Sequence, residues 1–194
     1  MSQEIEIEYK NLITREEYKQ LLKTYPFPSK GKKQINHYFE TPDKRLQKQG
    51  CAIRIREKSN TYTLTLKEPH PSGLLETHDI IHKETFHQWV SGNIIPQPYT
   101  TGQLINRGIQ PEHLKYMGNL ETIRNETNYK GVLLVLDISK YNGYMDYELE
   151  LEASDESVGL HLFNEILDHQ GIEKRSTPNK IKRFYTSLQH HPGR

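Results

Sequence analysis

The sequence predicts an α+β, mainly β protein in which eight antiparallel strands close into a barrel, or tunnel, with helices packed outside. Roughly eight segments alternate polar and apolar residues with a period of two, which is the pattern of β-strands. Most neighbouring segments are joined by short connections, which favours antiparallel pairing. In four of the segments charged or hydroxyl side chains form a row on one face, which leaves an apolar face free to pack against helices.

The bulk properties narrow the class of protein. The 194 residues show no linker, so we expect a single domain over residues 1–194. A formal net charge of +1 does not indicate a surface for nucleic acid. We expect no membrane partner either, because the N-terminus lacks a signal-peptide pattern and no apolar run approaches ~18 residues. The single cysteine, Cys51, excludes an internal disulfide and fits a cytoplasmic location. The oligomeric state stays open.

Hydrophobic periodicity and turn residues place the individual elements. Thr14 should cap the first helix through a capping box with Glu17, and Ser154 should cap the fourth. Pro178 should stand at the first position of the last helix. The tail 190–194 is expected to be disordered. Extended segments are expected at 4–10, 34–40, 52–58, 62–68, 73–81, 120–129, 132–139 and 146–153, and helices at 15–25, 84–90, 102–107, 155–170 and 177–188.

Two strands carry rows of acidic side chains, because residues two apart in a strand point to the same face. Neighbours in such a row lie ~7 Å apart, and at an effective dielectric of about 20 they repel by roughly 2 kcal/mol. A row that faces the interior therefore needs counter-cations. The first row is Glu4, Glu6 and Glu8, and the second is Asp146, Glu148, Glu150 and Glu152.

Two further strands carry basic or hydroxyl side chains on one face. Half-exposed antiparallel strands also alternate charged and apolar residues, so a solvent-exposed sheet is the simpler alternative. Two observations argue against an exposed sheet. Exposed sheets usually mix positive and negative charges on one face, whereas these rows have a single sign. The helices must also cover an apolar surface, and the strands offer only one such face. Arg54, Arg56 and Lys58 form one row, and Thr61, Thr63, Thr65 and Lys67 form the other.

An interior lined by acidic and basic rows suits a metal-bound polyphosphate. Mg²⁺ and Mn²⁺ prefer carboxylate oxygens, whereas arginine and lysine bind phosphoryl oxygens. Phosphoryl transfer needs mainly positioning and charge neutralisation, which such a cavity supplies. We therefore expect a hydrolase of small-molecule triphosphates that depends on Mg²⁺ or Mn²⁺.

Short motifs occur along the chain in an order that resembles the CYTH superfamily, the triphosphate tunnel metalloenzymes. The first is Glu6-Ile7-Glu8-Tyr9-Lys10, an E-x-E-x-K signature close to the N-terminus. Later matches follow in family order at 52–56, 65–67, 121–124, 135–137 and 147–152. The resemblance covers nearly the whole chain and looks closest to a bacterial, Firmicutes-type branch.

The resemblance implies a fold, an activity and a set of site residues. Members form an eight-stranded antiparallel tunnel and hydrolyse inorganic tripolyphosphate, thiamine triphosphate or nucleoside triphosphates, and a few are adenylate cyclases. Glu6, Glu8 and Lys10 match the catalytic motif. Lys180 and Arg183 resemble a C-terminal basic element that binds substrate, with a solvated helix face as an equal alternative. The implied metal ligands are Glu6, Glu8, Asp137, Glu148, Glu150 and Glu152, and the implied phosphate-binding residues are Lys10, Arg54, Arg56, Lys67 and Arg124.

Other polar or reactive residues are given structural roles. Glu4 extends the first acidic row but lies outside the motif, so we expect a surface charge at a strand end. His78 and His82 are four residues apart in a predicted strand, where that spacing does not form a zinc pair. Trp89 and Cys51 are expected to serve in packing.

Three functions are weighed: hydrolysis of a triphosphate, binding of polyphosphate or a nucleotide without turnover, and a structural role. The five glutamates of the first and last strands, Glu6, Glu8, Glu148, Glu150 and Glu152, would face a polyanion and bring nothing to pure phosphate capture, which favours catalysis. Adenylate cyclase activity is a further alternative, disfavoured because no base-recognition pattern is visible. The sequence identifies neither the organic group on the triphosphate nor a general base.

Overall fold

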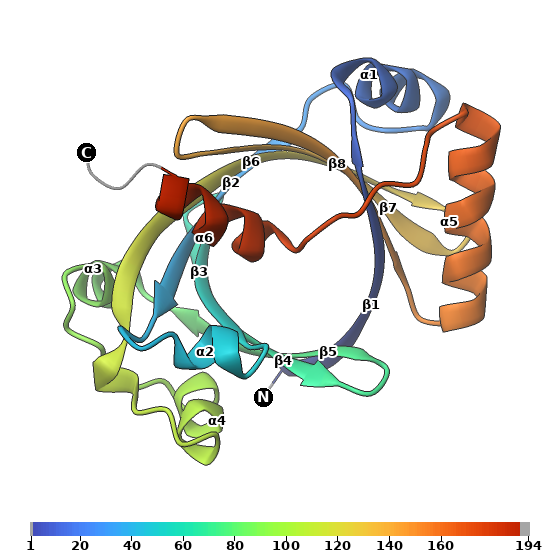
Figure 1. Ribbon diagram of the computed structural model, residues 1–194. Helices are drawn as coiled ribbons and strands as arrows, with labels where there is room; N and C mark the ends of the chain where they lie inside the picture. The colour runs from blue at the N-terminus through green and yellow to red at the C-terminus, as the bar shows by residue number, and fades with distance from the viewer. Residues whose placement is uncertain (1, 191–194) are drawn as a thin grey trace. The chain divides into compact units, whose positions relative to one another are not determined.

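The structure, a computed structural model, describes residues 2–190 and contains the strands and helices that the sequence predicts (Figure 1). The short helix α2 and the 3₁₀ helix η1 were not expected. The strands close into an antiparallel barrel in the order β1-β5-β4-β3-β2-β6-β7-β8, which confirms the predicted fold class. The elements are β1 (Ser2–Ile13), α1 (Arg15–Thr24), β2 (Lys32–Glu40), α2 (Arg45–Lys48), β3 (Ala52–Lys58), β4 (Thr61–His70), β5 (Gly73–Ile81), α3 (Lys83–Val90), α4 (Thr100–Asn106), η1 (Pro111–His113), β6 (Lys115–Tyr129), β7 (Val132–Tyr141), β8 (Tyr144–Ala153), α5 (Glu156–Gln170) and α6 (Lys180–His190).

The chain forms two compact units. The first unit contains Met1–Ile5 and Gln34–Asn119, and the second contains Glu6–Lys33 and Leu120–Arg194. The expected single domain over residues 1–194 stays a prediction. The tail expected to be disordered begins at His190, the last residue of α6, and its residues 191–194 lie outside the described part of the chain. No helix within residues 2–190 combines the length and the apolar character that a bilayer span requires.

In the second unit, β8 lies between β1 and β7, and β7 pairs with β6. One face of these strands is apolar and is covered by α1 and α5 (Figure 1). Leu149 and Leu151 of β8 are fully buried there, in one cluster with Leu21 of α1 and Phe163 of α5. Each such side chain contributes about 1.5–3 kcal/mol through burial. The charged residues that alternate with these leucines consequently lie on the opposite, polar face.

The first unit is built in the same way. Its strand β4 lies between β3 and β5, and β3 pairs with β2. Ile53 and Leu66 are fully buried in a cluster with Trp89 of α3 and Leu104 of α4. Because side chains alternate along β3, its arginines lie on the face opposite this cluster.

The helix starts follow the sequence signals with one correction. The capping box of α1 is present as predicted, since Thr14 Oγ1 accepts from the Glu17 amide at 3.1 Å and the Glu17 carboxylate accepts from the Thr14 amide at 2.7 Å. The expected cap of α5 was wrong by one residue, because Asp155 and not Ser154 accepts from the Val158 amide. A carboxylate at this position also interacts favourably with the helix dipole.

The start of α6 also differs from the prediction, because the helix begins at Lys180 and not at Pro178. The Thr177 hydroxyl instead accepts from the Leu12 amide at 2.8 Å and donates to the Arg175 carbonyl at 3.0 Å. Arg175 in turn donates to both carboxylate oxygens of Glu17, at 2.7 Å and 2.8 Å. The segment that precedes α6 is thereby bound to β1 and to α1.

Gly159 marks a close approach of α5 to the sheet. A Cβ at this position would lie 2.8 Å from Ala153 Cβ and 2.8 Å from Tyr9 Cε2. We expect Gly159→Ala to lower the free energy of unfolding by about 1–3 kcal/mol through overpacking. The loss should appear even though alanine is a better helix former than glycine by about 1 kcal/mol. Urea unfolding measures the difference.

Gly102→Ala is the matched control, since Gly102 lies in α4 and a Cβ there meets nothing within 4 Å. This variant should be as stable as the wild type or more stable by up to about 1 kcal/mol. Equal stability of the Gly159→Ala and Gly102→Ala proteins would contradict the close packing of α5.

Candidate functional site

Lys180, the first residue of α6, lies among three carboxylates on the polar face of the second unit. Its ammonium nitrogen is 2.5 Å from Glu150, 2.9 Å from Asp137 and 3.1 Å from Glu148. The carboxylates come from β7 and β8, where Asp137 and Glu148 are register partners. Their exposed fractions are 0% for Asp137, 1% for Glu148 and 5% for Glu150. Three carboxylates so buried depend on nearby cations for their charge.

Arg124 of β6 brings a second cation to this cluster. Its guanidinium donates to both oxygens of Asp137, at 2.9 Å and 2.7 Å, and to Glu150 at 2.6 Å. It also lies 3.8 Å from Glu152. Bidentate, charge-assisted bonds of this kind are the strong ones in proteins. Asp137 and Glu150 are therefore held by both Arg124 and Lys180.

Arg183 of α6 is the third cation. It forms an ion pair with Glu148, and its Nε lies 3.0 Å from Asp146. The side chains of Lys180 and Arg183 are 13% and 9% exposed, so neither belongs to a solvated helix face. Of the two alternatives for Lys180 and Arg183, a basic element near the charged residues therefore agrees with their positions better than a solvated helix face does.

The balance of burial and charge differs between neighbouring carboxylates. Burial and repulsion from Glu150 outweigh the nearby cations at Glu148, so the pKa of Glu148 lies above its ordinary value. Burial alone would also raise the pKa of Glu150, but attraction to Lys180 and Arg124 holds it below its ordinary value. At Lys180, attraction to its three carboxylates outweighs burial and raises the pKa. Lys180 and Arg124 thus keep Glu150 ionised.

The E-x-E-x-K residues lie on β1 in the same unit. In the antiparallel register Glu8 stands opposite Glu152 and Lys10 stands opposite Glu150. Lys10 forms an ion pair with Glu8. Glu6 is half-buried on the same face, and the Glu152 side chain is 30% exposed against 6% for Glu150. The motif therefore adjoins the carboxylates of β8, and its own acidic groups are the more accessible ones.

Arg54 and Arg56 of β3 lie on the polar face of the first unit, opposite Tyr38 and Asn36 of β2. Arg56 Nε donates to Asn36 Oδ1 at 3.1 Å. The Nε of Arg54 is buried and has no hydrogen-bond partner within the described residues. A buried donor without an acceptor is unfavourable by about 1–3 kcal/mol, and by more when it is charged. Arg54 is therefore suited to an anionic ligand.

Lys67 of β4 forms an ion pair with Glu76 of β5, its register partner. His78 lies beside them, with its Nδ1 3.0 Å from the Thr65 hydroxyl and its Nε2 3.2 Å from Glu4. The donor atoms of Glu4, Glu76 and His78 lie within 4.8 Å of one another, in a combination of ligand types that metal ions accept. The first unit thus carries a mixed cluster and not only a basic row.

Sequence reasoning did not single out Glu76, and it treated Glu4 and His78 as structural. Glu4 is exposed, as predicted, but it is also the partner of His78. Alternation within the segment 73–81 places Glu76 and His78 on one face. Leu74 and Ile80 lie on the same face, so the sequence does not show a continuous polar row there. His82 ends up at the start of α3 and not in the strand with His78.

Each polar face offers its own set of polar groups. Oxygen donors from β1 and β8 fit a hard divalent cation such as Mg²⁺ or Mn²⁺, which the resemblance implies. Arginine and lysine side chains on both faces fit phosphoryl oxygens. The donor set contains carboxylates in place of the thiolates that softer metals prefer.

Comparison with known proteins relates the whole chain to one family. Residues 4–185 match the model of the CYTH domain. YjbK of Bacillus subtilis strain 168, whose assignment as a triphosphatase is provisional, is 40% identical over 186 residues, which are 95% of this chain and 96% of YjbK. A crystal structure from Bacillus halodurans, of a protein provisionally described as an adenylate cyclase, is 40% identical with a TM-score of 0.89 and covers 95% of this chain and 100% of its own.

A more distant likeness is to a structure of lower sequence identity. A structure from Hippeastrum, of a protein described as having a dominant triphosphatase activity, has a TM-score of 0.79. It is 22% identical and covers 94% of this chain and 96% of its own. At this identity the likeness concerns the fold alone.

Proposed function

The chain belongs to the CYTH domain family, and from this premise we propose that it is a triphosphatase that removes the terminal phosphoryl group of a triphosphate with the aid of a divalent cation. The observation that carries the proposal is the excess of carboxylates over cations on the polar face of the second unit. The described part of this face holds four cations, Lys10, Arg124, Lys180 and Arg183, and at least seven carboxylates, those of Glu6, Glu8, Asp137, Asp146, Glu148, Glu150 and Glu152. Such a face would repel a polyphosphate unless a metal ion neutralised it. The provisional assignment of YjbK as a triphosphatase supports the same conclusion.

We assign the metal chiefly to Glu6, Glu8 and Glu152. Glu8 and Glu152 are register partners and all three are partly accessible. When bound, Mg²⁺ or Mn²⁺ would neutralise charge on the phosphoryl oxygens and lower the pKa of water. The remaining expected ligands, Asp137, Glu148 and Glu150, contact Lys180, Arg124 or Arg183 in the structure, and we propose that they hold these cations in place.

The basic residues are assigned to the phosphoryl oxygens of the substrate. An anionic oxygen would satisfy the buried Nε of Arg54, and the planar guanidinium allows a bidentate contact. Positioning and neutralisation of this kind supply most of the catalysis of phosphoryl transfer. The set contains Lys10, Arg54, Arg56, Lys67, Arg124, Lys180 and Arg183.

Replacement of Arg54 by alanine tests this assignment. A charge-assisted contact is worth about 1.5–3 kcal/mol, so kcat/KM for the triphosphate should fall roughly ten- to a hundredfold. KM should rise, because the contact is already made in the ground state. Steady-state phosphate release with tripolyphosphate and excess Mg²⁺ measures both constants.

Arg45→Ala is the control, since Arg45 is an exposed arginine of the same unit that pairs with Asp43 at 2.9 Å. It should leave kcat/KM within about twofold of the wild type, as expected for an exposed ion pair. If Arg54→Ala behaves like Arg45→Ala, Arg54 does not bind substrate.

Two other functions predict different outcomes. A binding module would bind tripolyphosphate without releasing phosphate. An adenylate cyclase, the provisional description of the Bacillus halodurans relative, would convert ATP into cyclic AMP and pyrophosphate. Separation of the products of ATP by anion exchange distinguishes these cases, because a triphosphatase that accepts ATP would form ADP and phosphate.

The proposed setting is the cytoplasm, with a small-molecule triphosphate as partner and neither nucleic acid nor membrane involved. Cys51 is free and buried, which agrees with a reducing compartment. The formal net charge of +1 gives no general attraction to nucleic acid.

A further inference from the structure

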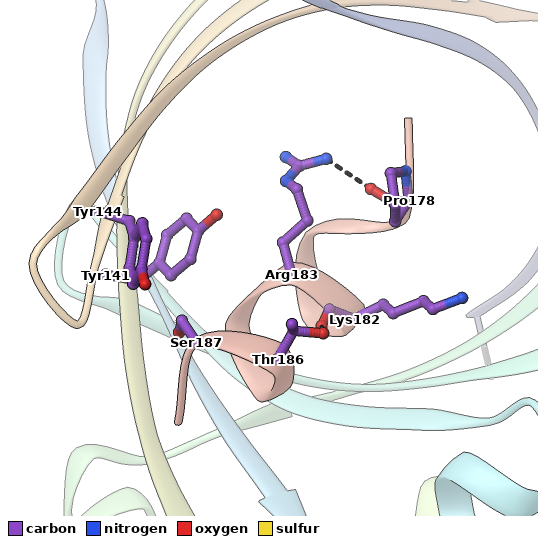
Figure 2. Close-up of a pocket in the computed structure, with 7 residues that line it drawn as sticks. All are labelled: Tyr141, Tyr144, Pro178, Lys182, Arg183, Thr186 and Ser187. Atoms are coloured by element: carbon purple, nitrogen blue, oxygen red, sulfur yellow. Dashed lines mark hydrogen bonds between the residues drawn. The ribbon is translucent and has the colours of Figure 1, made fainter. Parts of the chain in front are cut away.

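The β7–β8 hairpin and α6 enclose a pocket that hydrolysis of a terminal phosphoryl group does not itself need. Its volume is about 260 Å³. Pockets for drug-sized ligands occupy about 300–1,000 Å³, so this one suits a single ring system. Figure 2 shows the two tyrosines on one side of the pocket and Arg183 on the other. The lining includes Tyr141, Tyr144, Pro178, Arg183, Thr186 and Ser187, all from the second unit.

The hairpin presents flat aromatic surfaces to this pocket. Tyr141 and Tyr144 are register partners on either side of Asn142 and Gly143, whose positive φ angles of 46° and 81° fit a tight two-residue turn. The two rings are stacked, with centroids 6.1 Å apart and planes at 24°. The Tyr141 hydroxyl donates to Asp146 at 2.7 Å, which fixes that ring. Tyr144 is 42% exposed.

Arg183 connects the pocket to the charged cluster. Its Nη1 donates to the Pro178 carbonyl at 2.5 Å inside the pocket (Figure 2). Its other side pairs with Glu148 and Asp146. Glu148 also contacts Lys180, at 3.1 Å. Arg183 is therefore connected to the ammonium group of Lys180 through one side chain, that of Glu148.

We propose that this pocket binds the aromatic ring of an organic triphosphate whose phosphate chain continues past Arg183 toward Lys180. The inference rests on the proposed triphosphatase function and specifies its substrate class. Aromatic rings and a guanidinium plane stack on heterocycles, whereas inorganic tripolyphosphate has no group that would use them. A nucleobase and the rings of thiamine share this chemistry.

Tyr144→Ala tests the proposal through a comparison of substrates. We measure kcat/KM for ATP, thiamine triphosphate and inorganic tripolyphosphate in wild type and variant. Loss of one aromatic platform should lower the ratio of organic to inorganic kcat/KM by roughly tenfold, mainly through KM. Tyr144→Phe should keep the wild-type ratio, because the ring is retained. A fall in the ratio for ATP would show that the pocket binds a nucleobase, and a fall in the ratio for thiamine triphosphate would show that it binds a ring of thiamine.

Tyr99→Ala is the matched control, because Tyr99 is 40% exposed and does not line the pocket. Its substrate ratios should equal those of the wild type. If the Tyr144→Ala ratios for both organic substrates stay within about twofold of the wild-type ratios, the proposal that this pocket binds the ring (the ring pocket) is wrong. That holds even if tripolyphosphate is hydrolysed normally.

Calorimetric binding of ATP and tripolyphosphate separates this inference from the proposed function. If the wild type hydrolyses nothing, the triphosphatase proposal fails. The ring pocket would then stand only if Tyr144→Ala still weakens ATP binding relative to tripolyphosphate binding by roughly tenfold, and it would fall if both ligands are affected equally.

Discussion

Replacing Glu8 by glutamine is expected to lower kcat by about 100- to 1,000-fold, the range seen when one electrostatic stabiliser of a transition state is removed. Glutamine keeps the size of the side chain but removes a charge from the proposed metal site. It also leaves Lys10 without its ion-pair partner. KM should change less than kcat, because the metal matters most where negative charge develops. Steady-state phosphate release at saturating Mg²⁺ measures the effect.

Glu16→Gln is the control for Glu8→Gln, since Glu16 is exposed in the first turn of α1. It should retain the wild-type kcat. Excess Mn²⁺ should partly restore the Glu8→Gln enzyme if the substitution mainly weakens metal affinity. A Glu8→Gln enzyme with kcat within about threefold of the wild type would remove Glu8 from the metal site.

Replacing Lys180 by methionine is expected to destabilise the protein by about 3–5 kcal/mol, the usual result of removing one partner from a buried ion pair. Methionine fills a similar volume, so the loss would come from charge. Among the described residues, Arg124 and Arg183 would then be the remaining cations in contact with Asp137, Glu148 and Glu150. Urea unfolding near neutral pH measures the change in the free energy of unfolding.

Lys130→Met is the matched control. Lys130 also pairs with a glutamate, Glu165, at 2.8 Å, but its side chain is 52% exposed. Exposed pairs contribute about 0–1 kcal/mol, so this variant should unfold close to the wild type. Comparable losses in Lys180→Met and Lys130→Met would show that the carboxylate cluster does not depend on Lys180.

The alternation of residues in strands was enough to predict the polar and apolar faces. Glu148 and Glu150 share a face with Asp137 because every second residue of a strand points the same way, and the register of β7 and β8 then brings them together. The barrel followed from the number of such strands and from the need of the helices for an apolar surface. These features depend on residues close in sequence.

Contacts between distant segments could not be predicted in the same way. Lys180 and Arg183 enter the cluster because the segment before α6 is bound to β1 and α1, through Thr177 to Leu12 and Arg175 to Glu17. Each of these pairs is more than 150 residues apart in sequence, and no local pattern indicates them. The same segment explains why α6 begins at Lys180 and not at Pro178.

The role of β5 was missed for a different reason. Glu76 and His78 alternate with buried residues as a charged row would, but Ile80 continues the row as an apolar side chain. The mixed row concealed a contact with Lys67 and Glu4 that only the strand register reveals. The proposed ring pocket likewise depends on α6 reaching the β7–β8 hairpin.

The most direct test is phosphate release by the purified wild-type protein from tripolyphosphate, ATP and thiamine triphosphate, each with Mg²⁺, with Mn²⁺ and with EDTA. We expect release from at least one substrate with Mg²⁺ or Mn²⁺ and none with EDTA, because the carboxylates need a divalent cation before a polyphosphate can bind beside them. Undiminished release in EDTA would contradict the metal-dependent mechanism. No release from any substrate with either metal, while calorimetry shows tripolyphosphate binding, would make the protein a binding module and not an enzyme.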